Sequence, residues 1–206
     1  MTFPDKPYRD AAAYSADYFS SLSEAAAAIE TQGFEHAAAL ISAAIQSDRT
    51  IYACGNGGSA AISNHLLCDF AKGIQTDTEM RPKIVSLSAH VELITAIGND
   101  IAFDDIYLFQ LRTAARRGDV LLAISSSGDS ENIVRAIEWA KVNDVRTVSL
   151  TGFDGGRCRG LADANIHVPA HNYGVVEDLH QSAMHILAQY VRQRHMPEEL
   201  IAVRKF

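Results

Sequence analysis

The sequence lacks the features that would place it in a membrane, secreted or nucleic-acid-binding class. Its 206 residues contain no run of about 18 consecutive apolar residues, so no segment is expected to span a membrane. Residues 1–6 have neither the basic nor the apolar region of a secretion signal, which favours a cytoplasmic protein. No Lys/Arg run is present and the net charge is −7, so nucleic acid is not expected as a partner.

Cysteine is also scarce, with three residues that are far apart in the chain: Cys54, Cys68 and Cys158. An odd number of cysteines without a C-x-x-C motif predicts reduced thiols rather than a disulfide framework. Cys54 and Cys68 lie in apolar runs, and we expect both to be buried and inert rather than nucleophilic.

The composition is that of an ordinary globular protein, with 48% hydrophobic and 21% charged residues. A chain of this length can bury a full core without disulfides or a structural metal. Because the protein is acidic, an anionic ligand would have to be held by local backbone and hydroxyl donors rather than by net positive charge.

Two kinds of hydrophobic pattern divide the chain. Residues 14–29 and 34–47 carry apolar side chains at spacings of three and four, which predicts two amphipathic helices. The first helix is longer than its own domain needs, so packing against another subunit is one use for its apolar stripe, and covering its own domain is the other. Beyond residue 48, β-prone runs alternate with helical stretches. Strands are predicted at 50–54, 83–87, 120–125, 147–151 and 165–168. Helices are predicted between and after them, at 60–71, 89–97, 104–115, 130–143 and 175–194.

Strands that alternate with helices predict an α/β fold with a parallel sheet covered on both faces. We find no repeat, low-complexity segment or long linker. We therefore expect a single domain over 1–206, with N-terminal helices at 1–48, an α/β core at 49–195 and a polar tail at 196–206.

Two loops between a predicted strand and a predicted helix are candidates for a phosphate site. Gly55-Asn56-Gly57-Gly58-Ser59 follows the first strand, and its free N–H groups and helix dipole would favour an anion. By itself this loop could be only a tight turn. The loop at 125–130 reads Ser-Ser-Ser-Gly-Asp-Ser and supplies four hydroxyls. A helix cap alone would explain one of these residues, not five, so we favour a phosphate site here.

Histidine and carboxylate pairs on two predicted helices form a candidate acid–base or metal site. His65 and Asp69 are four residues apart and share a helix face. On the last helix, Glu177 and His185 fall on one broad face together with His180, for which a structural role is the simpler interpretation. Two histidines and two carboxylates could bind a divalent metal such as zinc, or could act as acid and base without one.

Four segments of the sequence carry a family resemblance: Cys54-Gly-Asn-Gly-Gly-Ser59, Gly98-Asn-Asp100, Gly118-Asp-Val-Leu-Leu-Ala-Ile-Ser-Ser-Ser-Gly-Asp-Ser130 and Leu150-Thr-Gly-Phe-Asp-Gly-Gly156. Together they resemble the bacterial phosphoheptose isomerases, a branch of the sugar-isomerase (SIS) domain superfamily. The resemblance implies a flavodoxin-like three-layer αβα sandwich and a homotetramer with active sites between subunits. It also implies interconversion of sedoheptulose 7-phosphate and D-glycero-D-manno-heptose 7-phosphate through an enediol, in the synthesis of lipopolysaccharide heptose.

The resemblance also assigns residues. The phosphate would be held by Ser125, Ser127 and Ser130, and sugar hydroxyls by Asn56, Ser59 and Asp100. With the remaining loop residues and the last helix, the candidate substrate-binding set is Asn56, Gly57, Gly58, Ser59, Asp100, Ser125, Ser126, Ser127, Ser130 and Glu177. One zinc ion per subunit would be bound by His65, Asp69, Glu177 and His185.

This sequence departs from the family at two of the zinc and catalytic positions. Asp69 stands where the family has Glu, and Glu177 where it has Gln. A basic residue of the family has no clean equivalent, although Lys72 is near its position. We expect Glu177 or Asp69 to be the base and His185 the acid. The alternatives are an isomerase of a different sugar phosphate, or a non-catalytic SIS protein that binds the bacterial replication initiator. A regulatory sugar-phosphate-binding domain would normally adjoin a DNA-binding region, and none is evident in the sequence.

Overall fold

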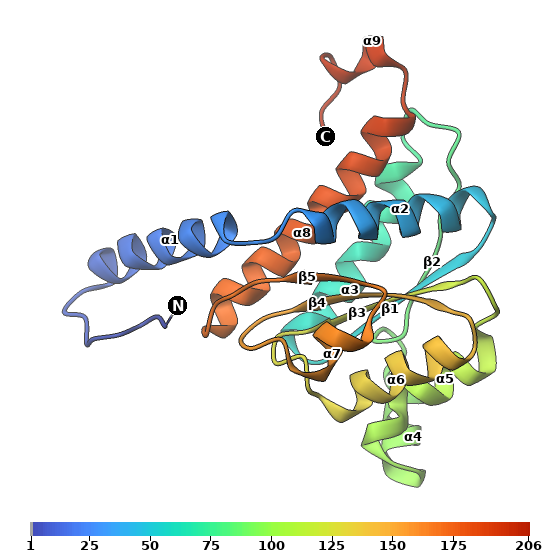
Figure 1. Ribbon diagram of the computed structural model, residues 1–206, viewed down its shortest axis with the longest axis horizontal. Helices are drawn as coiled ribbons and strands as arrows, with labels where there is room; N and C mark the ends of the chain where they lie inside the picture. The colour runs from blue at the N-terminus through green and yellow to red at the C-terminus, as the bar shows by residue number, and fades with distance from the viewer. Residues whose placement is uncertain (1) are drawn as a thin grey trace.

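The computed structural model describes residues 2–206, which are built around one five-stranded parallel sheet (Figure 1). The strands are β1 (Thr50–Gly55), β2 (Lys83–Ser86), β3 (Val120–Ser125), β4 (Arg146–Thr151) and β5 (Ala164–His167). Their order across the sheet is β2-β1-β3-β4-β5, which is the flavodoxin-like order. The predicted parallel α/β sheet is therefore confirmed, and each predicted strand agrees with the observed one to within a residue at either end.

Helices cover both faces of this sheet (Figure 1). One face carries α2 (Gln32–Gln46), α3 (Gly58–Cys68) and α8 (Tyr173–His195). The other carries α4 (Val91–Asp100), α5 (Ile106–Ala114), α6 (Glu131–Val142) and α7 (Gly156–Leu161). Short helical turns are found at η1 (Asp69–Ile74), η2 (Phe103–Asp105) and α9 (Glu198–Ile201). The three layers match the predicted αβα sandwich.

The central strands are buried on both faces, as their continuous apolar sequences predict. Along β1, Ile51 and Ala53 pack in the core beneath α2, α3 and α8, while Tyr52 and Cys54 pack in the core on the opposite face. Successive side chains of a strand point to opposite faces, so one apolar run supplies both cores.

Helix α1 (Ala11–Ala27) extends away from the sheet (Figure 1). Ala25 is its buried residue, whereas Phe19 is 65% exposed. The helix is tied to α8 by Tyr18, whose hydroxyl donates to Asp178 Oδ2 at 2.6 Å. Much of its apolar stripe is thus left open to solvent in the single chain.

Three features differ from the sequence predictions. Helix α7 was not predicted, because its Gly-rich sequence carries no helical periodicity. The predicted helix at 60–71 ends as an α-helix at Cys68 and continues as the π-helical turn η1. The tail contains α9 and folds back, so that the Phe206 ring lies 4.7 Å from the Arg192 guanidinium.

The cysteine predictions are confirmed in part. Cys54 is buried, and burial raises the pKa of its thiol, which makes it inert as expected. Cys68 is exposed, so the prediction that it is buried was wrong. Leu66 and Phe70 face the core, whereas Leu67 and Cys68 lie on the outward side at the end of α3. No helix within residues 2–206 has the length and apolar character needed to cross a membrane.

Candidate active site

The two predicted phosphate loops meet at one edge of the sheet. They follow β1 and β3, which are neighbours in the sheet although β2 lies between them in sequence. Connections on either side of such a switch in strand order leave a crevice at the carboxyl ends of the strands. A cavity of about 270 Å³ lies there, lined by Asn56, Gly57, Gly58, Ser59, Ile124, Ser125, Ser126, Ser127, Ser130, Tyr173 and Glu177. We call this cavity the serine pocket.

The first loop owes its shape to glycine. Gly57 has a φ of 54°, in the left-handed region that residues with a Cβ rarely adopt, and α3 starts at the next residue. The Asn56 and Asn132 amides exchange two hydrogen bonds of 2.9 Å. Tyr107 also donates to the Asn56 side chain, at 3.2 Å. Asn56, expected to bind a sugar hydroxyl, therefore also fixes the loop to α6.

The second loop is folded on itself, and one of its hydroxyls has no partner. Ser125 Oγ accepts from the Gly128 amide at 3.1 Å, and Ser127 Oγ accepts from the Asp129 amide at 3.3 Å. Ser126 is buried, and its Oγ has no hydrogen-bond partner among residues 2–206. A buried hydroxyl without a partner costs free energy, so a ligand oxygen in the serine pocket would relieve that cost.

The serine loop packs at Gly128 against a second glycine-rich segment, at Gly155 and Gly156. Gly128 has a φ of 67°, and a Cβ there would lie 1.9 Å from the carbonyl oxygen of Gly155. The Gly128 carbonyl in turn accepts from the Cys158 amide at 2.8 Å. The close approach of the two backbones explains why both segments are rich in glycine.

Glu177 forms one wall of the serine pocket. It reaches the pocket from α8, and its carboxylate lies against the start of α3, where a Cβ at Gly58 would be 2.2 Å from Glu177 Oε2. Burial raises the pKa of Glu177, and the charge of Asp178 adds to this effect. The sequence reasoning thus selected a carboxylate that shares the pocket with the serine hydroxyls.

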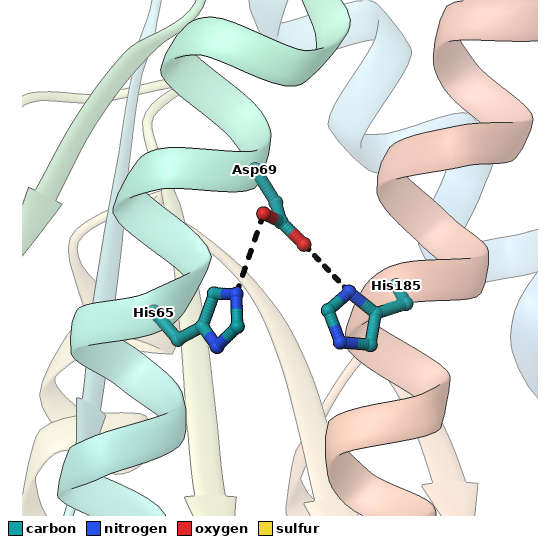
Figure 2. Close-up of side chains that lie close together, drawn as sticks. All are labelled: His65, Asp69 and His185. Carbon is teal, nitrogen blue, oxygen red and sulfur yellow. Dashed lines mark hydrogen bonds and ion pairs between the residues drawn. The ribbon is translucent and has the colours of Figure 1, made fainter. Parts of the chain in front are cut away.

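A second cluster brings together His65, Asp69 and His185 (Figure 2). His185 Nδ1 lies 2.6 Å from Asp69 Oδ2, and His65 Nε2 lies 3.5 Å from Asp69 Oδ1. The ligand atoms of all three residues lie within 4.8 Å of one another. Two imidazoles and a carboxylate are a donor set that suits zinc, so the residues present fit that ion. We call this group the His–Asp–His cluster.

Within residues 2–206 of the single chain, Glu177 does not group with this cluster, so its role as a fourth zinc ligand stays a prediction. Two contacts hold α8 beside α3 and the turn η1 that follows it, joining Gln181 to His65 and His185 to Asp69. Nearer the start of α8, Glu177 lies against Gly58 at the start of α3. Glu177 and His185 are eight residues apart on α8, an axial distance of about 12 Å.

The remaining predicted residues have separate places. Asp100 is exposed at the end of α4 and is not part of the wall of the serine pocket. His180 is fully buried, and burial lowers its pKa to about 4, so it is a neutral core residue at pH 7. Lys72 lines a different cavity of about 420 Å³, which also contains Asp69 and His185.

Sequence reasoning missed three residues near the two sites. Asn132 pairs with Asn56, and Tyr173 lines the serine pocket. Gln181 contacts the rings of both histidines of the cluster. The sequence could have indicated Gln181, because it lies four residues from both Glu177 and His185 and therefore on the same helix face. Nothing local in the sequence connects Asn132 with Asn56.

Comparison with known proteins identifies the family. The family model described as "SIS domain" matches residues 14–152, which include both phosphate loops, His65 and Asp69. The chain belongs to the SIS domain family. Helix α8, with Glu177 and His185, lies beyond the matched part of this SIS domain protein.

Individual relatives extend the similarity to most of the chain. The phosphoheptose isomerase of Colwellia psychrerythraea is 35% identical over 187 residues, covering 88% of this chain and 95% of the relative. The DnaA initiator-associating protein DiaA of Edwardsiella ictaluri is 34% identical over 178 residues, covering 85% of this chain and 90% of the relative. The solved structure of phosphoheptose isomerase GmhA from Neisseria gonorrhoeae is 32% identical with a TM-score of 0.79, covering 87% of this chain and 95% of that one. These likenesses support a sugar-phosphate isomerase.

Proposed function

We propose that this SIS domain protein is an aldose–ketose isomerase that converts sedoheptulose 7-phosphate to D-glycero-D-manno-heptose 7-phosphate. The observation that carries the proposal is the serine pocket, in which hydroxyl donors and a carboxylate of raised pKa line one cavity. The similarity to phosphoheptose isomerases supports the choice of substrate.

The serine loop would bind the phosphate. Ser125, Ser127 and Ser130 line the pocket at its edge, and Ser126 brings a buried hydroxyl without a partner. Neutral donors are the appropriate ones here, because this acidic chain offers no cationic residue among those that line the pocket.

The carboxylates and His185 would carry the proton transfer. Isomerisation moves a proton between adjacent carbons through an enediol, which requires a base at the carbon and an acid near the oxygens. Glu177 is suited to the role of base, because burial raises its pKa towards the range in which a carboxylate can both take and return a proton. The contact of Asp69 with His185 Nδ1 orients that imidazole as the acid.

Glu177 and His185 must act on the same two adjacent carbons of the sugar, and this favours an active site shared between subunits. Within one chain, Glu177 and His185 are separated by about 12 Å along α8. A homotetramer would allow the serine pocket of one subunit to meet the His–Asp–His cluster of another. The exposed stripe of α1 offers a surface for such assembly. Light scattering should find more than one chain per particle at micromolar concentration, and an active monomer would contradict this.

The His–Asp–His cluster would hold one zinc ion per subunit. His65, Asp69 and His185 would be its ligands, with the remaining position open. Bound there, zinc would polarise the sugar carbonyl and stabilise the enediolate. The long carboxylate of Glu177 would join this site only if a neighbouring subunit brought it there.

One assay tests the reaction directly. The protein is incubated with a panel of C5 to C7 ketose phosphates, and aldose formation is followed by NMR. We expect turnover of sedoheptulose 7-phosphate, with a Glu177→Ala variant as the inactive control. Turnover of another member of the panel instead would assign a different sugar phosphate.

A second candidate function follows from the relatives named DnaA initiator-associating protein DiaA. A non-catalytic protein that binds the replication initiator would share this fold and both loops. The carboxylate retained at Asp69, in contact with His185, favours the enzyme. Lack of turnover with the whole panel, together with binding to purified initiator protein, would favour the second candidate. The cytoplasmic location and the absence of nucleic-acid partners remain predictions.

A further inference from the structure

Gln181 touches both histidines of the His–Asp–His cluster with one group. Its Nε2 lies 3.0 Å from His185 Nε2 and 3.3 Å from His65 Nδ1. These ring nitrogens are the ones that do not face Asp69, which instead contacts His185 Nδ1 and His65 Nε2. Each imidazole is therefore held on one side by a carboxylate and on the other by the same amide.

The hydrogen bonds of this arrangement are mutually consistent for neutral rings. An amide NH₂ group has two N–H donors, so Gln181 Nε2 can donate to both imidazoles at once. A neutral imidazole carries one proton, so the ring nitrogens that accept from Gln181 are unprotonated. The protons then lie on His185 Nδ1 and His65 Nε2 and face the Asp69 carboxylate, which only accepts.

In this arrangement the ring nitrogens that face Asp69 carry protons and cannot bind a metal beside it, because a metal ligand needs a free lone pair. The nitrogens that face Asp69 would have to lose their protons to the opposite side of each ring. Turning the Gln181 amide over would place Oε1 where Nε2 lies, and a carbonyl oxygen can accept from two N–H groups. Both rings would then donate to Gln181 and direct their lone pairs towards Asp69.

We propose that Gln181 is a positioning residue whose amide turns over when the His–Asp–His cluster binds zinc. A single side chain thereby sets the tautomers of His65 and His185 together. The inference rests on the zinc site of the proposed function. It adds a partner outside the ligand set, of the kind that commonly fixes the tautomer of a metal-binding histidine.

The tautomers can be measured directly by long-range proton–nitrogen NMR on the ¹⁵N-labelled full chain, at about pH 8, where ordinary imidazoles are neutral. Without metal, we expect protons on His185 Nδ1 and His65 Nε2. One equivalent of zinc should move them to His185 Nε2 and His65 Nδ1. Tautomers that are the same with and without zinc would overturn the proposal.

Variants of Gln181 distinguish the hydrogen bonds of its amide from the effect of adding a negative charge near the cluster. Gln181→Met removes the donor and the acceptor at similar length, and we expect zinc affinity to fall by about 10- to 100-fold. Gln181→Glu can only accept, which favours the metal-binding tautomers but also adds a negative charge. Ser182→Glu adds that charge at the next, exposed position and is the matched control. Gln181→Glu should bind zinc more tightly than Ser182→Glu.

Two results with the variants would contradict a positioning role for the Gln181 amide. A parent-like zinc dissociation constant for Gln181→Met, or equal constants for the two Glu variants, would each overturn its role. If Gln181→Met fails to fold, the tautomer measurement on the parent chain decides alone. A parent chain that binds no zinc at these residues would also overturn this inference. It would leave the isomerase proposal to be decided by the turnover assay with the ketose phosphate panel, which measures aldose formation and not zinc binding.

Discussion

Glu177 packs its carboxylate directly against the backbone of Gly58, at a point where a Cβ atom would lie 2.2 Å from Oε2. The glycine at this position thus leaves room for a side chain that comes from α8, 119 residues later in the chain. The glycine at the start of α3 therefore lets Glu177 enter the serine pocket.

Gly58→Ala should displace Glu177 without unfolding the protein. The added methyl group meets the far end of a flexible side chain, and alanine is a better helix former than glycine, so the melting temperature should not fall. We expect kcat to fall by about 100-fold, the scale that a misplacement of about 1 Å can cost. Gly160→Ala is the matched control, since a Cβ there meets no atom within 4 Å. Parent-like activity of Gly58→Ala would remove Glu177 from the mechanism.

Glu177→Gln should abolish most activity and alter the pH dependence of stability. Burial raises the pKa of Glu177, so the folded state binds its proton more tightly than the unfolded state does. The contribution of Glu177 to stability therefore falls as pH rises from the unfolded value of 4.5 through the raised folded pKa. The Gln variant should be more stable than the parent at neutral pH, and the difference should shrink at lower pH. Thermal unfolding across pH measures this, and parallel curves would contradict it.

In the parent protein, the raised pKa of Glu177 should also determine how kcat/KM depends on pH. A base must be unprotonated to act, so kcat/KM should fall as pH drops through the raised pKa of Glu177. A profile without an acid limb at a raised carboxyl pKa would exclude Glu177 as the base.

Ser126→Ala and Ser127→Ala should weaken ligand binding without destabilising the fold. Each removes a hydroxyl from the wall of the serine pocket, and we expect the affinity for a sugar phosphate to fall by about 1–3 kcal/mol. Ser126→Ala should be at least as stable as the parent, because it removes a buried hydroxyl without a partner. Calorimetric titration and denaturant unfolding provide the two measurements. Unchanged affinity in both variants would place the phosphate site elsewhere.

His65→Ala should lose both zinc and activity. Protein purified without chelator should carry about one zinc ion per chain by elemental analysis, because each chain supplies one His–Asp–His cluster. The exposed His36 of α2 provides the matched control, and His36→Ala should keep its zinc. Full activity in chelator-treated, metal-free protein would leave His185 and the carboxylates as a plain acid–base pair.

The pattern of residues along the chain was sufficient to predict every strand and the two loops that line the serine pocket. Strand periodicity and glycine-rich turns are local properties, and each strand was placed to within a residue. The pairing of His65 with Asp69 was likewise local, since positions four apart on a helix share a face. Helix α7 was missed because its six residues include two glycines and carry no helical periodicity, and Cys68 was misplaced because an apolar run does not tell which position faces the core.

Only the tertiary structure decided how the last helix meets the first loop. The sequence placed Glu177 and His185 on one face of a helix, but it did not contain the register of α8 against α3. That register depends on how the side chains of two helices fit together, which is a property of the packed core and not of either segment. It separates Glu177 from the His–Asp–His cluster, seats it against Gly58 in the serine pocket, and brings Gln181 between two histidines that are 120 residues apart.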